Sequence, residues 1–110
     1  IQDIGATIED FIKPKGYGIV RDLVGHGVGH SVHEEPNVPN FRDPWSTRQR
    51  LVEGMVLAIE PMIALGSWKV KTLRDGWTVV TTDRSVCAHF EVTIAVTKDG
   101  YDLVTPWPDA

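Results

Sequence analysis

The chain of 110 residues has one cysteine, no long apolar run and no excess of basic residues. Cys87 has no cysteine to pair with in this chain, so the fold does not require an oxidising compartment. The longest apolar stretch, residues 55–65, is interrupted by Glu60 and Pro61 and is too short to cross a bilayer. From residue 1 onward there is also no basic-then-apolar leader pattern. We therefore expect a cytoplasmic protein that does not contact a membrane.

Several function classes lack their usual signatures. The net charge is −4 with both signs interspersed, which does not form the basic stripe of a nucleic-acid binder. The glycines at 25, 27 and 29 alternate with other residues and lack the strand–turn–helix spacing of a phosphate loop. Neither Ser31 nor Ser46 lies in a Gly-x-Ser-x-Gly elbow. Cys87 and His89 could form a nucleophile pair, but nothing supplies the third, orienting group. Nucleotide binding and serine or cysteine hydrolysis are therefore disfavoured.

The first twelve residues predict an amphipathic helix. Their large apolar side chains fall on one face at helical spacing, at Ile1, Ile4, Ile8, Phe11 and Ile12. Pro14 and Gly16 predict where the helix ends. The pattern starts at residue 1 without a capping residue before it, so we expect the chain to be part of a longer protein. Its length fits one domain.

The rest of the chain predicts antiparallel strands. Asp75-Gly76 predicts a hairpin between residues 70–73 and 77–81, and Asp99-Gly100 predicts another that leads into residues 101–105. Residues 17–23 and 51–63 read as extended segments, whereas the glycine-rich 25–30 and the proline-rich 34–45 predict irregular structure. Residues 86–97 alternate, with apolar side chains at even positions. His89 and Glu91 therefore share the polar face. One helix followed by such strands predicts an α+β fold.

Three of the four histidines, His26, His30 and His33, occupy one eight-residue window. Histidine is a common metal ligand and general base, although a solvated polar loop would also explain the cluster. Glu60 lies in an apolar setting where a carboxylate is costly unless an ion, an arginine or backbone N–H groups pair with it. Glu91, alone, would simply be solvated. One histidine and two glutamates that converge would suit Mn, Fe, Co or Zn.

These residues together resemble the type I methionine aminopeptidases. The resemblance extends from Ile4 to about Thr105 and is carried by four segments in order: Gly25-His26-Gly27-Val28-Gly29-His30-Ser31-Val32-His33-Glu34-Glu35-Pro36, Glu53-Gly54-Met55 with Ile59-Glu60-Pro61-Met62, Asp75-Gly76-Trp77-Thr78, and Ala88-His89-Phe90-Glu91. The Glu-Pro-Met and Gly-Trp-Thr elements favour this branch over the related prolidases and X-Pro aminopeptidases.

The resemblance implies half of a pita-bread fold, with residues 1–110 as the C-terminal half of the catalytic domain. It implies a hydrolase that removes N-terminal methionine from peptides and nascent proteins with two divalent ions (Co, Mn, Fe or Zn). His26, Glu60 and Glu91 match family metal ligands. His33 matches a catalytic histidine that contacts the substrate, and Glu60 is also expected to help move a proton. Trp77 matches a residue near the methionine pocket.

Two departures from the family pattern bear on the expected activity. Two further ligands, both aspartates, and another catalytic histidine belong to the family's N-terminal half and have no counterpart here. The chain also carries Val92 and Val32 where the family usually has a histidine and a larger side chain. We expect the isolated chain to be inactive and to need the missing half as its partner. The alternatives are a non-catalytic pita-bread binding module and a self-associating half-domain.

Overall fold

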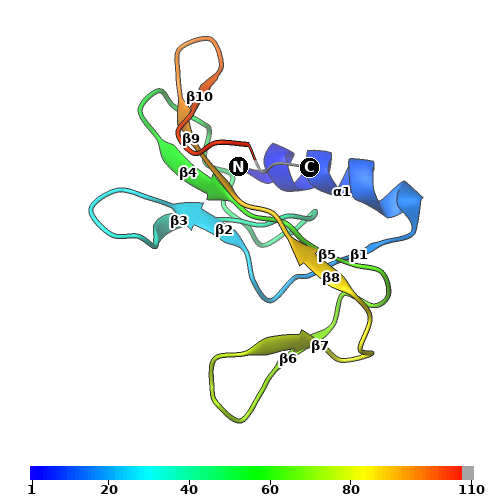
Figure 1. Cartoon of the computed structure of the whole chain (residues 1–110). Coiled ribbons are helices and arrows are strands. Elements are labelled where there is room, and N and C mark those ends of the chain that lie inside the picture. The colour runs from blue at the N-terminus through cyan, green and yellow to red at the C-terminus, as the bar shows by residue number, and fades with distance from the viewer. Residues whose placement is uncertain (108–110) are drawn as a thin grey trace.

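The computed structural model describes residues 1–107, in which one helix precedes a set of short strands (Figure 1). The expected α+β class, with one N-terminal helix and antiparallel sheets, is confirmed. In chain order the elements are α1 (Gln2–Ile12), the 3-10 turn η1 (Lys13–Lys15), β1 (Gly18–Ile19), β2 (Gly25–Gly27), β3 (Glu34–Val38), β4 (Val56–Ile59), β5 (Met62–Ala64), β6 (Val70–Thr72), β7 (Val79–Thr81), β8 (Cys87–His89), β9 (Val92–Val96) and β10 (Tyr101–Leu103).

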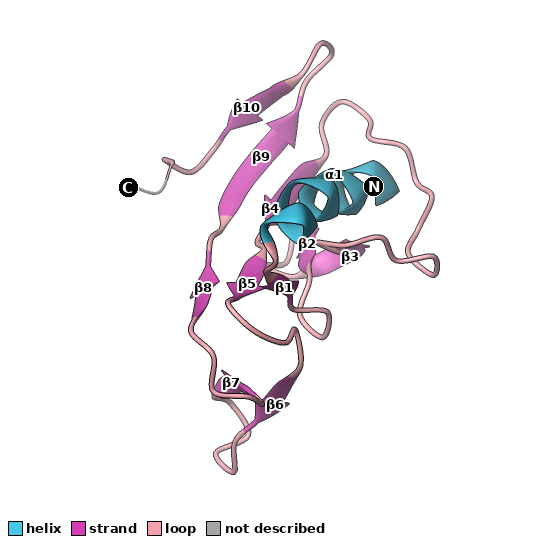
Figure 2. Cartoon of the chain, turned by 90° about the vertical axis from the view of Figure 1, so that its right-hand side faces the viewer, coloured by secondary structure: helices cyan, strands magenta, loops and turns pink. Residues whose placement is uncertain are grey.

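Three antiparallel sheets make up the β structure of residues 1–107. The largest has the strand order β10-β9-β4-β2-β3, a second has the order β1-β5-β8, and β6 pairs with β7 in a hairpin. Figure 2 shows α1 lying alongside the sheets and the β6–β7 hairpin set apart at one end. Within residues 1–107, no helix is both long and apolar enough to cross a membrane.

The two larger sheets share one continuous strand pairing. Ile59 is opposite Val92 in the β4–β9 pair, and Met62 is opposite His89 in the β5–β8 pair. The same register joins them, because the Phe90 N–H donates to the Pro61 carbonyl at 3.1 Å. Residues 56–64 and 87–96 therefore run as one antiparallel ladder with a short break in the middle.

Both segments that were expected to be irregular contain strands. Residues 25–27 form β2, with β3 on one side and β4 on the other, and residues 34–38 form β3. The sequence prediction was wrong here because it treated glycine and proline as strand breakers. The single strand expected over 86–97 is interrupted at Phe90 and Glu91, and the segment 17–23 is extended only at 18–19. Both hairpins and the helix are confirmed.

The hydrophobic core is small and lies between α1 and the larger sheet. Ile1, Val38 and Leu57 are buried against one another, and Ile4 and Ile94 pack on them. The apolar side chains further along α1 instead border an apolar groove (the α1 groove) between the helix and β5–β8, lined in part by Ile8, Phe11, Ile63, Leu65, Val86 and Phe90. Phe11 is 65% exposed and Phe90 is 52% exposed. Among the apolar side chains at even positions of residues 86–97, those before β9 border the α1 groove, and only those in β9 face the core.

Candidate metal centre

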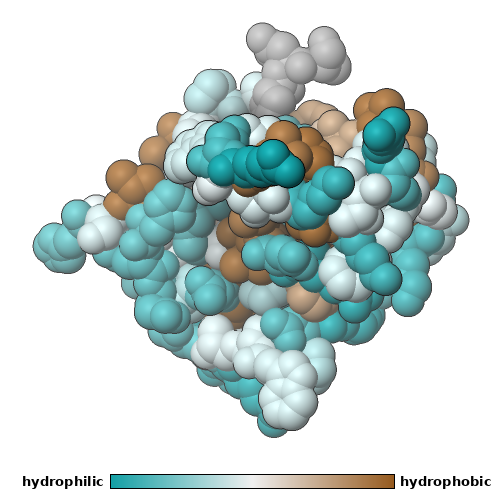
Figure 3. Space-filling model, turned by 90° about the horizontal axis from the view of Figure 1, so that it is seen from below, coloured by the Kyte–Doolittle hydropathy of each residue, from teal (hydrophilic) through white to brown (hydrophobic). Residues whose placement is uncertain are grey.

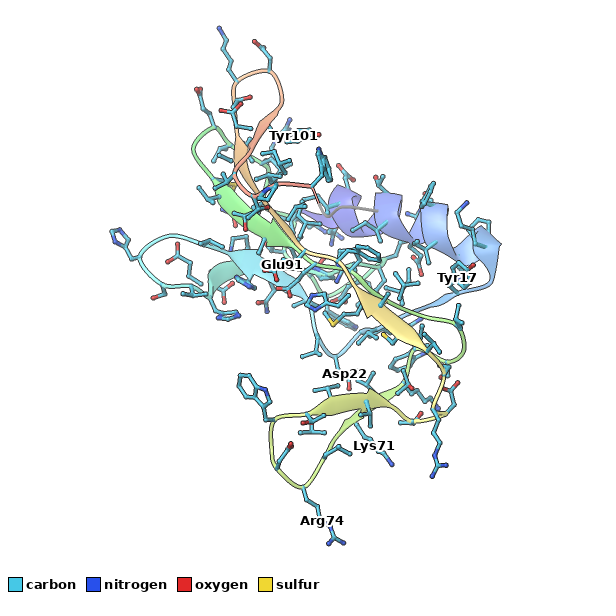
Figure 4. All side chains as sticks on the ribbon, viewed as in Figure 1. Tyr17, Asp22, Lys71, Arg74, Glu91 and Tyr101 are labelled. Atoms are coloured by element: carbon cyan, nitrogen blue, oxygen red, sulfur yellow. The ribbon has the colours of Figure 1, made fainter. Side chains whose placement is uncertain are left out.

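Three of the predicted ligands converge where the two larger sheets meet. His26, Glu60 and Glu91 each offer one ligand atom, and these atoms lie within 4.8 Å of one another. His26 comes from β2, Glu60 from the link between β4 and β5, and Glu91 from the link between β8 and β9. Figure 4 shows Glu91 at this junction, near the centre of the molecule. Nitrogen and carboxylate donors at this spacing are a donor set that first-row divalent ions prefer.

Strand pairing places the three side chains on one face. His26 is opposite Ala58 on β4, and Glu60 is two residues beyond Ala58. Side chains opposite each other, or two apart along a strand, point to the same side of a sheet. The shared register places Glu60 directly opposite Glu91. The neighbouring position Leu57 points the other way and is buried in the core against α1.

The hydrogen bonds of His26 fix which ring nitrogen faces the acidic residues. Nδ1 is 2.9 Å from the carbonyl oxygen of Gly27 and must donate to it, because a carbonyl oxygen only accepts. In the neutral ring, Nε2 therefore presents a lone pair to Glu60 Oε1, 3.1 Å away. Two lone pairs at that distance require a proton or a cation between them. A ring that donates its other N–H to a backbone carbonyl is the arrangement typical of a metal-binding histidine.

The two carboxylates also favour a positive charge between them. Like charges directly opposite on neighbouring strands destabilise a sheet, and Glu60 and Glu91 occupy such a pair of positions. Within the described residues, the ionic partners of Glu60 are His26 and His89, and neither is a lysine or an arginine. A divalent cation would neutralise both carboxylates. The donor set therefore fits the metal that the sequence predicts.

Glycines allow the strand that carries His26 to pack this closely. A Cβ atom at Gly25 would collide with the carbonyl oxygen of Ala58 on one side and contact that of Val38 on the other. A Cβ at Gly27 would collide with the carbonyl of Glu35. These two glycines therefore lie where the backbone of β2 approaches its neighbouring strands closely.

His33 lies beside the three candidate ligands. Its ring centroid is 4.0 Å from that of His26, with the planes tilted by 40°. His33 is exposed and lines a cavity of about 650 Å³ (the His33 cavity) together with Glu60. The remaining lining is mostly apolar, at Val20, Leu23, Val24, Met62, Val70, Val79, Val80, Thr81, Ser85, Cys87 and His89. Figure 3, seen from below, shows brown apolar surface set among hydrophilic residues on that side.

Two other sequence candidates lie outside this cluster. Trp77, at the tip of the β6–β7 hairpin, is 87% exposed and is not among the residues that line the His33 cavity. Asp75 organises that tip by accepting from the Trp77 and Thr78 N–H groups, and the Thr78 side chain and these N–H groups lower the pKa of its carboxyl. His30, the middle histidine of the window, is exposed on the loop after β2.

His89 was not expected at the metal site, although the structure places it against the candidate ligand Glu60. Its Nε2 is 3.1 Å from Glu60 Oε2. The signal was available, because His89 and Glu91 are two residues apart on one strand face. Cys87 shares that face and lines the cavity, where burial raises the pKa of its thiol.

The chain is similar to known proteins over nearly its whole length. The pattern of Metallopeptidase family M24 matches residues 1–98. The chain is 50% identical to a methionine aminopeptidase of Clostridium perfringens, over 96% of this chain and 42% of that protein. It is 55% identical to one of Borreliella burgdorferi, over 94% of this chain and 41% of that protein. It thus spans about two fifths of the length of these relatives.

Comparison with solved structures leads to the same group of proteins. A methionine aminopeptidase from Thermotoga maritima superposes with a TM-score of 0.87 at 46% identity, over 93% of this chain and 41% of the other. One from Rickettsia prowazekii gives 0.86 at 42% identity, with the same coverage of both chains. The expected fold, half of a pita-bread architecture, is confirmed. On sequence and on structure alike, the chain belongs to metallopeptidase family M24.

Proposed function

We propose that this chain forms the C-terminal half of a metal-dependent hydrolase that removes N-terminal methionine from peptides and nascent proteins. The observation that carries the proposal is the convergence of His26, Glu60 and Glu91, with their ligand atoms within 4.8 Å of one another on one face of the sheet. A half-domain that only bound a partner would gain nothing from two carboxylates placed opposite each other. The non-catalytic alternative is therefore disfavoured.

His26, Glu60 and Glu91 would hold divalent ions, two in the complete enzyme, with Co, Mn, Fe or Zn compatible with these donors. Such an ion lowers the pKa of water and polarises a substrate carbonyl. Glu60 has one oxygen toward His26 and lines the His33 cavity, which supports a role as proton acceptor at the edge of the substrate site. His33, exposed in the same cavity, would donate a hydrogen bond to the substrate's reacting carbonyl.

The lining of the His33 cavity supports binding of an apolar side chain. Its wall combines Val20, Met62 and Cys87 with valines of the β6–β7 hairpin, while His33 and Glu60 provide the polar end. A site with mostly apolar walls and a few polar groups at one end orients an amphipathic ligand. A methionine side chain would lie on the valines, with its amino group and peptide bond toward the polar end. Contact with Trp77 remains a prediction of the resemblance.

We propose that an N-terminal half of the same fold is the partner that completes the site. The chain spans about two fifths of its relatives, and the α1 groove leaves Phe11 and Phe90 more than half exposed. An apolar groove of this kind is typical of a buried contact. Two aspartate ligands are expected from that half, so the reading frame upstream of Ile1 should encode two aspartates at ligand spacing. A frame without them would contradict this assignment.

Metal binding by the isolated chain tests the three ligands directly. We expect Co²⁺ to bind weakly in isothermal titration calorimetry, and the variant His26→Ala to lose most of that binding. His30→Ala is the matched control, because His30 lies in the same window on an exposed loop and should leave the affinity unchanged. Equal losses in the two variants would show non-specific binding and contradict the ligand assignment.

Turnover tests the reaction. We expect the chain alone to release little or no methionine from Met-Ala-Ser, whereas the complete protein should release it only with a divalent ion present. The complete protein should leave Leu-Ala-Ser largely uncleaved if the cavity selects methionine. Full metal-dependent turnover by a monomer of the chain alone would show that the second half is not required.

A further inference from the structure

The carboxylate of Glu60 has an imidazole on each oxygen. His26 Nε2 is 3.1 Å from Oε1, and His89 Nε2 is 3.1 Å from Oε2. A carboxylate only accepts hydrogen bonds, so Nε2 of His89 is the donor in the second contact. The Glu60 side chain is 13% exposed, whereas that of His89 is 47% exposed. Glu60 therefore has an N–H donor, His89, on its solvent side and the His26 ring on its buried side.

The strand register alone brings His89 close to Glu60. His89 is the last residue of β8 and pairs with Met62 on β5. Glu60 is two residues before Met62, so the His89 side chain lies diagonally across the ladder from the carboxylate. Diagonal neighbours on one face are within reach of long side chains.

The two imidazole contacts respond differently to a bound cation. An ion held by His26 and Glu60 Oε1 would take the place of their direct contact, because both groups have lone pairs to offer it. The His89 contact uses the other oxygen and can persist unchanged. Glu60 would then offer the ion one oxygen, because its second oxygen accepts from His89.

We propose that His89 is a positioning residue that fixes the orientation of the Glu60 carboxylate and keeps it a one-oxygen metal ligand. The inference rests on the proposed function, in which Glu60 binds a divalent ion. Groups that hydrogen-bond to metal ligands orient them, and their removal typically costs about 10–100-fold in metal affinity or activity. A partly exposed contact belongs at the lower end of that range.

Removal of the donor tests the proposal in the chain as it stands. We expect His89→Ala to weaken Co²⁺ binding about tenfold in isothermal titration calorimetry. His89→Gln should remain within about threefold of the unchanged chain, because its amide N–H can donate to the same oxygen. The metal-minus-apo infrared difference spectrum should show a smaller separation of the two carboxylate stretches in His89→Ala, as Glu60 engages the ion with both oxygens. The melting temperature without metal should hardly change, because partly exposed ionic contacts contribute little stability.

Each contrary result has its own meaning. If the unchanged chain binds Co²⁺ and His89→Ala binds it equally well, the positioning role is wrong and the ligand assignment stands. If His89→Gln loses as much affinity as His89→Ala, donation to Glu60 is not what His89 supplies, and the proposal fails. If the unchanged chain does not bind Co²⁺ at all, both the proposed function and this inference are overturned.

Discussion

Replacement of Glu91 by glutamine should have opposite effects on the chain with and without metal. Glu91 is directly opposite Glu60 in the shared ladder, and like charges so placed cost about 0.2–1 kcal/mol. Because Glu91 is exposed, solvent screens the repulsion, and we take about 0.5 kcal/mol as its size. Glu91→Gln removes that repulsion while preserving the shape of the side chain. The metal-free variant should therefore be slightly more stable than the unchanged chain.

Thermal unfolding measures both effects in one experiment. For a domain of this size about 1 kcal/mol corresponds to about 4–8 °C, so the metal-free variant should melt about 2–4 °C higher. A cation at 100 times its dissociation constant stabilises the folded state by about 2.7 kcal/mol, which raises the melting temperature of the unchanged chain by about 11–22 °C. Glu91→Gln should lose most of that rise at the same Co²⁺ concentration.

The effect on the metal-free chain and the effect on Co²⁺ binding can be refuted independently. A metal-free variant that melts lower than the unchanged chain would mean that Glu91 is held by a favourable contact, and the argument from opposed charges would be wrong. A variant that keeps the full Co²⁺-dependent rise would mean that Glu91 does not bind the ion. Low ionic strength should be used, because added salt screens the repulsion.

Three further predictions concern stability. Leu57→Ala should lower the free energy of unfolding by about 2–5 kcal/mol in a urea titration, because Leu57 is 1% exposed in a small core; a loss below 1 kcal/mol would contradict the assigned core. Gly25→Ala should destabilise the chain by about 1–3 kcal/mol and weaken Co²⁺ binding, because its Cβ would meet the backbone of Ala58; unchanged calorimetry would refute this. Hydrogen bonds from backbone N–H groups, that of Ser67 first, lower the pKa of Asp83 to about 2. The stabilising contribution of the Asp83 carboxylate should therefore be lost as the pH falls from about 4 to about 2. Asp83→Asn should lack that part of the decline in melting temperature.

The sequence was sufficient to identify the candidate ligands because each belongs to a motif of a few neighbouring residues. His26 stands between glycines, and Glu60 is the acidic residue in an apolar run. Their convergence is a property of strand pairing between distant segments, which local periodicity does not encode. The resemblance to a family supplied that information, and the structure agrees with it for His26, Glu60 and Glu91.

The errors have a common physical origin. Residues 25–27 and 34–38 were expected to be irregular from local glycine and proline propensity, yet both are strands of the largest sheet. Pairing with neighbours on both sides outweighs the intrinsic cost of glycine in β2, and the missing side chains are what allow those neighbours to approach. The side-chain contact of His89 was missed because it depends on the register between β5 and β8.

The single ladder formed by residues 56–64 and 87–96 restricts how this part of the chain can change in length. Insertion of one residue into either strand would turn every later side chain to the opposite face, so Glu60 and Glu91 would no longer share a side. Only a matched change in both strands, or one confined to a turn, would preserve the pairing. Length variation among related proteins should therefore collect in the β6–β7 turn and the turn before β10, and be rare between residues 56 and 64.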